Sequence, residues 1–330
     1  MTMRLVGSVV RFGAFLWTAC ASPHRAPIHG GVDLGYIAAT LSVGTPPRDF
    51  DVILDTGSQR TVLPCVRCND CGHVRAYDAT RSRTARATNR SFSMSYVEGS
   101  SLRGRFVEDV VVVGGVRARI SVGCADVMTK LFRTQAADGI AGLDDDPTSL
   151  VQALRAQDHS NTFGLRLCPG ARFFEVGGGT RGGVSAPFQK RRGNYYVQST
   201  GVGVEHGARL AHAAAWIVDS GTTFLYVDQV LLKWVRHRLA KVVVPTLAST
   251  SGVGCVRRGA ALPFLRLYWD DGQSLRLSPS QYTYRTIRGR LCVGVFDTGF
   301  GNENTLGLIA LEERATWFDL SRDHIAFDDC

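Results

Sequence analysis

The hydrophobic and polar positions of the chain repeat one order at two distant places. Residues 52–58 (VILDTGS) and 216–223 (WIVDSGTT) both begin with three apolar residues rich in β-branched types. An aspartate, a hydroxyl residue, a glycine and a second hydroxyl residue follow in each. β-branched runs favour strands, and the glycine with its polar neighbours favours a tight turn. Each segment therefore predicts a strand that ends in a turn and presents a carboxylate, Asp55 in the first copy and Asp219 in the second.

A second short motif follows each aspartate at nearly the same distance. Gly142, in residues 138–143 (DGIAGL), follows Asp55 by 87 positions, and Gly307, in residues 305–308 (TLGL), follows Asp219 by 88. A single Asp-Thr-Gly or Asp-Ser-Gly sequence would indicate only a structural turn. Two copies with matched flanks and matched spacing favour two related halves that each supply one carboxylate to a shared site.

Two carboxyl groups at one site have a distinct chemistry. Like charges that share a site cannot both ionise cheaply, so one carboxyl stays protonated while its partner acts as a base. With a water molecule between them, the pair can supply the acid and the base that amide hydrolysis requires. Asp55 and Asp219 are therefore the candidate catalytic residues.

Composition favours an all-β protein with two lobes. At 330 residues and 45% hydrophobic content the chain can form a sizeable core, and its 36 glycines suit many tight turns. We expect a first lobe over residues 22–177 and a second over 178–330, joined by the glycine-rich residues 177–187. Two short helices are predicted behind Asp146-Pro147 and Asp228. Their apolar positions are Leu150, Val151 and Leu154 in the first and Leu231, Val235 and Leu239 in the second.

Several further motifs carry a resemblance to a known family. Residues 44–50 (GTPPRDF), 95–100 (SYVEGS), 138–143 (DGIAGL), 317–319 (WFD) and 325–327 (IAF) resemble segments of the pepsin-family aspartic proteases, and the resemblance extends over residues 36–330. It implies the bilobal pepsin-like fold, with a cleft between two β-rich lobes and the aspartate pair inside it. It also implies supporting roles around the pair for Thr56, Gly57, Ser58, Ser220, Gly221 and Thr222. Ser58 and Thr222 are expected to hydrogen-bond the outer carboxylate oxygens.

The resemblance implies a flap over the cleft. Tyr96, Glu98, Gly99 and Ser100 match the flap hairpin, and we expect them to contact substrate. Most pepsins have a tryptophan at the position of Val62, where it hydrogen-bonds the flap tyrosine, so Tyr96 must have another partner here or none. The cysteine-rich segment before the flap is similar to the plasmepsin V group of apicomplexan aspartyl proteases of the endoplasmic reticulum or Golgi. Their flap glutamate contacts the arginine of an Arg-x-Leu motif.

The cysteines indicate an oxidising compartment. Nine are present, and removal of a signal peptide containing Cys20 would leave eight. The resemblance implies the pairs Cys255–Cys292 and Cys168–Cys330. The remaining four are Cys65, Cys68, Cys71 and Cys124, which with His73 could hold zinc. We favour two further disulfides, whose pairing the sequence leaves open.

Residues 1–21 resemble a secretory signal peptide, with Arg4 before an apolar run and small residues at the end. No other segment is long and apolar enough to anchor the mature chain in a membrane. We expect a monomer in the lumen of the endoplasmic reticulum or Golgi, or outside the cell. Asn89-Arg90-Ser91 is a glycosylation sequon expected on a surface loop. The net charge of +9 is spread over scattered arginines without interleaved aromatics, which argues against nucleic-acid binding.

These observations predict an aspartic endopeptidase that acts on peptide or protein substrates with no metal or organic cofactor. The plasmepsin V resemblance favours processing of secretory or exported proteins at Arg-x-Leu sites, with Glu98 facing the arginine and Asp78 as a second candidate. Glu98 could instead be a solvated residue of the hairpin tip. The alternatives are a broad-specificity secreted acid protease and a non-catalytic pepsin-like binding module.

Overall fold

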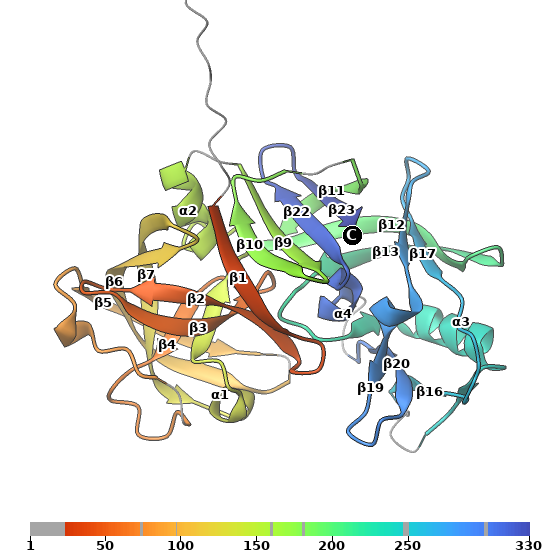
Figure 1. Ribbon diagram of the computed structural model, residues 1–330, viewed down its shortest axis with the longest axis horizontal. Helices are drawn as coiled ribbons and strands as arrows, with labels where there is room; N and C mark the ends of the chain where they lie inside the picture. Colours follow the sequence, from red (N-terminus) through yellow and green to blue (C-terminus); the bar gives the residue numbers. More distant parts are fainter. Residues whose placement is uncertain are drawn as a thin grey trace, which may run out of the picture.

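A computed structural model describes residues 24–72, 75–96, 98–158, 161–179, 182–246, 251–299 and 303–330. The predicted signal peptide and His73 lie outside the described residues. Figure 1 shows two β-rich lobes side by side with a sheet between them. This confirms the predicted all-β, bilobal fold. The structure describes no helix of sufficient length and apolarity to cross a membrane.

The first lobe is built around long antiparallel hairpins. The β6–β7 hairpin pairs Leu102 with Met128 at one end and Val113 with Val116 at the other. β3 and β8 are parallel neighbours at the centre of the lobe, where β8 and the four β3 residues that pair with it, 52–55, are all buried. The strands of this lobe are β2 (Tyr36–Val43), β3 (Arg48–Asp55), β4 (Thr61–Pro64), β5 (Arg86–Ser95), β6 (Ser101–Val113), β7 (Val116–Met128) and β8 (Gly139–Gly142).

The second lobe repeats this arrangement with different loops. β13 and β21 are parallel neighbours, as β3 and β8 are in the first lobe. Its strands are β12 (Asn194–Val204), β13 (Arg209–Val218), β14 (Leu225–Val227), β15 (Val243–Val244), β16 (Gly252–Val256), β17 (Leu265–Tyr268), β18 (Ser274–Leu277), β19 (Thr283–Arg285), β20 (Leu291–Asp297) and β21 (Asn304–Leu306). The two lobes are therefore related copies, as the repeated motifs predict.

A central antiparallel sheet joins the lobes, and both halves of the chain contribute strands to it. Its order is β1, β10, β9, β22, β23, β11. These strands are β1 (His24–Gly31), β9 (Thr162–Cys168), β10 (Ala171–Val176), β11 (Val184–Arg191), β22 (Arg314–Asp319) and β23 (His324–Asp329). β1 continues into the first lobe by pairing with β2, and β11 continues into the second by pairing with β12.

The connection between the halves is shorter than predicted. β11 begins at Val184, and its pairing with β23 takes up the Pro187 end of the expected linker. Residues 184–187 pair with β23, so their backbone groups have hydrogen-bond partners in the sheet and this part of the expected linker is a strand. The predicted division after residue 177 thus falls between two strands of the central sheet.

Both predicted helices are present, each behind its aspartate. The Asp228 carboxylate accepts the N–H groups of Val230 and Leu231 at the start of α3, which caps the helix. The predicted apolar positions of both helices are buried. The short helical elements are η1 (Ala79–Arg81), α1 (Leu131–Thr134), α2 (Leu150–Asp158), α3 (Gln229–Leu239), η3 (Pro279–Tyr282) and α4 (Leu308–Leu311).

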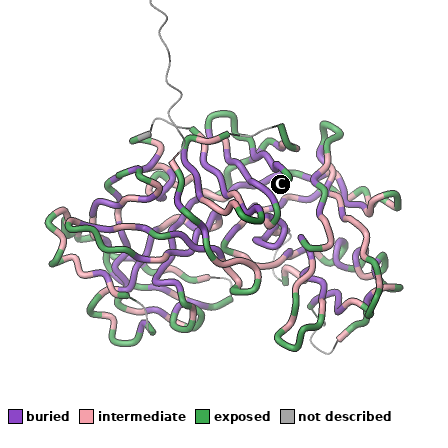
Figure 2. The backbone as a smooth tube through the Cα atoms, viewed as in Figure 1, coloured by how far each residue is buried: buried purple, intermediate pink, exposed green. Residues whose placement is uncertain are grey.

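The hydrophobic core runs continuously from one lobe to the other. Figure 2 shows buried residues along the central strands and exposed ones in the peripheral loops. At the junction, the Phe163 ring of β9 stacks on the Phe318 ring of β22 at 4.5 Å, and the Tyr195 ring lies 4.8 Å from Phe318. All three are fully buried. Such aromatic pairs add stability beyond the area they bury, so the lobes are held in one fixed relation.

Four disulfides connect the eight cysteines of residues 24–330. Cys168–Cys330 and Cys255–Cys292 are the pairs that the resemblance implies. The pairs that the sequence leaves open are Cys65–Cys124, which joins the residue after β4 to β7, and Cys68–Cys71, which closes a short loop. All four sulfurs of the cysteine cluster are thus engaged in disulfides rather than in a zinc site.

Candidate active site

The two repeated turns lie at the same place in the two lobes. Asp55 ends β3 and pairs with Gly142 of the parallel strand β8. Asp219 follows β13, whose last residue Val218 pairs with Leu306 of β21. A parallel strand that is buried on both faces needs a continuous apolar sequence, and each aspartate is preceded by one. The second motif of each half is thus the strand that supports the aspartate turn.

Hydrogen bonds cross between the two turns in a symmetrical pattern. The Thr56 hydroxyl donates to the Val218 carbonyl at 2.8 Å and accepts the Ser220 N–H at 2.9 Å. In return, the Ser220 hydroxyl donates to the Leu54 carbonyl at 2.7 Å and accepts the Thr56 N–H at 3.1 Å. Both residues are fully buried. These four bonds fix the position of one turn relative to the other.

The glycine of each turn faces the aspartate of the other. A Cβ atom on Gly57 would lie 2.7 Å from the carboxyl carbon of Asp219, and one on Gly221 would collide with the Asp55 carboxyl group. Only a residue without a side chain allows this approach. The two carboxyl groups therefore meet between the turns at a single site.

The two carboxyl groups have different surroundings. Burial raises the pKa of Asp55 well above its ordinary value, and the nearby charge of Asp219 raises it further. Asp219 is more exposed; its Oδ1 accepts the Gly221 N–H at 2.8 Å, and its Oδ2 accepts the Thr222 hydroxyl at 2.6 Å. This arrangement favours one proton on the pair, because the buried carboxyl resists ionisation beside a charged neighbour.

The β5–β6 hairpin brings Tyr96 close to the aspartate pair. Burial raises the pKa of the Tyr96 hydroxyl, and the charges of Asp55 and then Glu98 raise it further. The ring packs against Phe132 at 5.1 Å. Ser58 lowers the pKa of both Asp55 and Tyr96, yet within the described chain neither the Ser58 nor the Tyr96 hydroxyl oxygen has a partner in hydrogen-bond geometry. The expected bond from Ser58 to the carboxylate is therefore absent in that geometry, while the one from Thr222 is present.

The remaining flap residues occupy the hairpin turn. Glu98 and Gly99 are exposed, and Gly99 adopts a positive φ of 88°. Ser100 is buried, and its hydroxyl accepts the Leu131 N–H at 3.3 Å, which ties the hairpin to α1. Asp78 accepts the Thr80 N–H at 3.0 Å and so caps η1. Glu98 is thus the carboxylate at the flap tip, whereas Asp78 is engaged in a local structural bond.

Lys130 is a residue of the flap region that the sequence does not predict. Its ammonium lies 3.5 Å from the Glu98 carbonyl oxygen and against Gly99. Its backbone has a positive φ of 49°, immediately before α1. A single lysine outside any motif carries no sequence pattern that predicts this contact. It places a positive charge against the backbone of the flap tip.

Asp144 is a second unpredicted residue, two positions beyond Gly142. It is fully buried; its Oδ1 accepts the Asp146 N–H at 3.0 Å, and its Oδ2 has no partner among the described residues. Burial raises the pKa of this carboxyl to about 7, and the charges of Asp146 and Asp145 contribute. The run of three aspartates in residues 144–146 does not reveal which one is buried.

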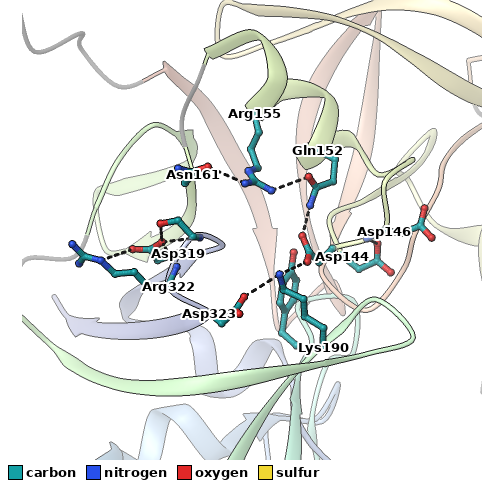
Figure 3. A network of polar contacts seen from close by, with 12 residues as sticks. Asp144, Asp146, Gln152, Arg155, Asn161, Lys190, Asp319, Arg322 and Asp323 are labelled. Atoms are coloured by element: carbon teal, nitrogen blue, oxygen red, sulfur yellow. Dashed lines mark hydrogen bonds and ion pairs between the residues drawn. The ribbon is translucent and has the colours of Figure 1, made fainter.

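The loop that carries Asp144 contacts the second half of the chain. The Asp145 N–H donates to the Gly193 carbonyl at 3.0 Å, and the Lys190 ammonium lies 2.7 Å from Asp145 and 2.9 Å from Asp323. Figure 3 shows Lys190 between this loop and Asp323. Asp144 therefore lies beside a network of polar contacts between the halves.

The predicted sequon has a different setting from the one expected. Asn89 is exposed but belongs to β5, where the pairing with β6 shifts register between Ala87 and Ser91. It is thus on a strand rather than on a loop. Sequence patterns do not locate such a shift of register reliably.

Comparisons with known proteins show which family the chain belongs to. The family model for eukaryotic aspartyl proteases matches residues 36–161 and 182–330. Aspartic protease 5 of Toxoplasma gondii is 33% identical over 158 residues, which are 36% of this chain and 16% of that protein. Syncephapepsin of Syncephalastrum racemosum is 30% identical over 213 residues, 58% of this chain and 53% of that protein. Rhizopuspepsin of Rhizopus chinensis is 25% identical over 297 residues, 82% of this chain and 72% of that protein.

The alignments to the first two of these relatives thus span less than two thirds of their lengths. The family model, in contrast, covers most of the chain and includes both aspartate turns and both supporting glycine motifs. The chain therefore belongs to the eukaryotic aspartyl proteases, the pepsin family.

Proposed function

We propose that the chain is an aspartic endopeptidase in which Asp55 and Asp219 act together on one water molecule. The observation that carries this proposal is the exchange of hydrogen bonds between Thr56 and Ser220, which holds the two turns face to face. A site of this kind is preorganised, because its geometry is fixed before substrate arrives.

The mechanism follows from the different surroundings of the two carboxyls. Asp55, the more buried one, keeps the shared proton and donates it to the oxygen of the scissile carbonyl. Asp219, oriented by the Thr222 hydroxyl and the Gly221 N–H, takes a proton from the water as it attacks the carbonyl carbon. That proton then passes to the departing amine, and the former carbonyl oxygen returns its proton to Asp55 as the C–N bond breaks. The amide bond breaks with net addition of one water.

The flap would complete the site when substrate binds. Tyr96 lies near Asp55, and closure of the β5–β6 hairpin would exclude bulk water from the pair. The buried hydroxyls of Tyr96 and Ser58 lack partners in the described chain, so each can hydrogen-bond a substrate amide or a bound water.

Arg-x-Leu is the specificity we propose. The Glu98 carboxylate is exposed at the flap tip and forms no ion pair within the described residues. A guanidinium beneath a closed flap would form a charge-assisted bond with it in a partly dry cleft. The Lys130 ammonium contacts the backbone carbonyl of Glu98, not its carboxylate. The disulfides support action in an oxidising lumen of the secretory pathway or outside the cell.

Cleavage profiling with a peptide library from pH 4 to 8 tests the proposal. We expect single cuts within peptides for the wild-type protein and none for the matched Asp219→Asn control. The Glu98→Gln variant should lower kcat/KM about tenfold for an Arg-x-Leu peptide and leave its Ala-x-Leu counterpart unchanged. Binding of a statine-type mimic without any cleavage would instead support a non-catalytic module. An equal loss of kcat/KM for both peptides would contradict the Arg-x-Leu specificity and support a broad-specificity protease.

A further inference from the structure

A cavity of about 540 Å³ lies beside the aspartate turn of the second half. It is bounded by the β1–β2 loop at Asp33 and by the β19–β20 hairpin, which extends from the second lobe in Figure 1. Phe224 lines the cavity and follows Thr222, the residue that binds Asp219, by two positions. The Thr223 hydroxyl between them donates to the Gly35 carbonyl at 2.7 Å. The cavity therefore begins two residues beyond Thr222 of the second aspartate turn and also borders the first half of the chain.

The hairpin that forms one wall is locally well ordered. Its strands pair through Arg285 and Leu291, and at its tip the Thr286 N–H donates to the Arg290 carbonyl at 2.9 Å. Gly289 adopts a φ of 75°, which closes the turn. The adjacent Cys292 is bonded to Cys255 of β16. Side chains on this tip are thus presented from a constrained backbone.

Three arginines of this hairpin, Arg285, Arg288 and Arg290, line the cavity, and Asp33 is the one acidic residue among the described lining. None of the three forms an ion pair in the described part of the chain; Arg285 donates only to the Gly289 carbonyl, at 3.2 Å. Like charges on adjacent turn positions repel one another. An anionic ligand would relieve this repulsion and would replace water at the exposed guanidinium groups.

The neighbouring cavity differs in charge. It has a volume of about 650 Å³ and shares Val32, Asp33, Tyr284 and Arg285 with the first. There Arg172 binds Glu312 through two contacts of 2.6 and 3.1 Å, and Glu313 accepts the Ser280 hydroxyl at 2.7 Å. The only other arginine in its described lining is thus paired, and its remaining charged residues are acidic. Unpaired positive charge is thus concentrated at the tip of the β19–β20 hairpin.

We propose that the arginine-lined cavity is a subsite for acidic side chains of the peptide substrate, at positions beyond those that flank the cleaved bond. Guanidinium forks match carboxylates in geometry and charge. The Phe224 and Tyr284 rings, 4.7 Å apart, offer an apolar surface for the intervening residues. The proposal rests on the proposed peptidase function and adds a preference among its substrates.

Binding of two statine-type peptides to the full chain tests the subsite. One carries three aspartates at an end and the other three asparagines, and each is prepared with the extension on the amino or the carboxyl side. Fluorescence anisotropy at low salt should show about tenfold tighter binding of the acidic peptide for one of the two placements. The preference should weaken as salt is added.

Arg288→Ala/Arg290→Ala should abolish the preference, whereas Arg67→Ala/Arg117→Ala should keep it. The control removes the same charge from exposed positions outside the cavity. All four residues are exposed, so thermal melting should confirm that both variants fold. Equal affinity for the two peptides, or an equal preference in both variants, would overturn the subsite.

Cleavage of a neutral peptide is measured in parallel to separate the two proposals. Cleavage without an acidic preference contradicts the subsite alone. An acidic preference in binding without cleavage supports the subsite and contradicts the peptidase.

Discussion

The two halves of the molecule agree at their aspartate turns and differ two residues beyond the supporting glycines. After Gly142 the first half places Asp144 there, and after Gly307 the second half places Ile309; both side chains are fully buried. The hydrogen bonds of Thr56 and Ser220 are nearly interchangeable by symmetry. The repeated plan is thus preserved where the halves must meet, and its surroundings have diverged.

The largest expected effect comes from the aspartates themselves. Asp55→Asn and Asp219→Asn should each lower kcat for a fluorogenic peptide by about 10²- to 10⁴-fold, because each removes the acid or the base of one pair. Initial rates beside thermal melting curves would measure this. If one variant kept substantial activity, the halves would contribute unequally and the shared-site interpretation would fail.

The next effect concerns the divergent position. The pKa of Asp144 is raised to about 7, above its unfolded value near 3.8, so its contribution to stability is complete below pH 4 and is lost as pH rises through 7. Asp144→Asn should remove this loss and make the protein more stable than wild type at pH 8, by on the order of 2 to 4 kcal/mol.

Urea unfolding at pH 5 and pH 8 measures this change. Ile309→Val is the control, since it keeps an apolar group at the corresponding position. It should lower the free energy of unfolding by the same amount at both pH values. A wild-type stability that does not depend on Asp144 between these pH values would mean that its carboxyl has access to solvent.

The smallest effect tests the symmetry of the turns. Thr56→Val and Ser220→Ala each leave a carbonyl and an N–H of the opposite turn without a partner in a buried place. Each should lower the free energy of unfolding by about 1–3 kcal/mol. Guanidinium titrations of both variants would show whether the losses match. A loss confined to one variant would show that the two turns contribute unequally to stability, although their hydrogen bonds match.

The sequence predicts those parts of the structure that depend on neighbouring residues. The apolar runs before Asp55 and Asp219 specify strands, and the Asp228 cap specifies the start of α3, because these effects act within a few residues. The Cys65–Cys124 pairing, the start of β11 at Val184 and the burial of Asp144 depend on contacts between distant segments. Nothing local distinguishes Asp144 from Asp145 and Asp146, and only the fold determines which side chain is buried.

The most direct test of the central claim is a double-mutant cycle on the aspartate pair. Single-turnover cleavage is measured for Asp55→Asn, Asp219→Asn and the double variant. If the two carboxyls work as one unit, the double variant should be no slower than either single variant. Losses that multiply would show two independent groups and contradict a shared site.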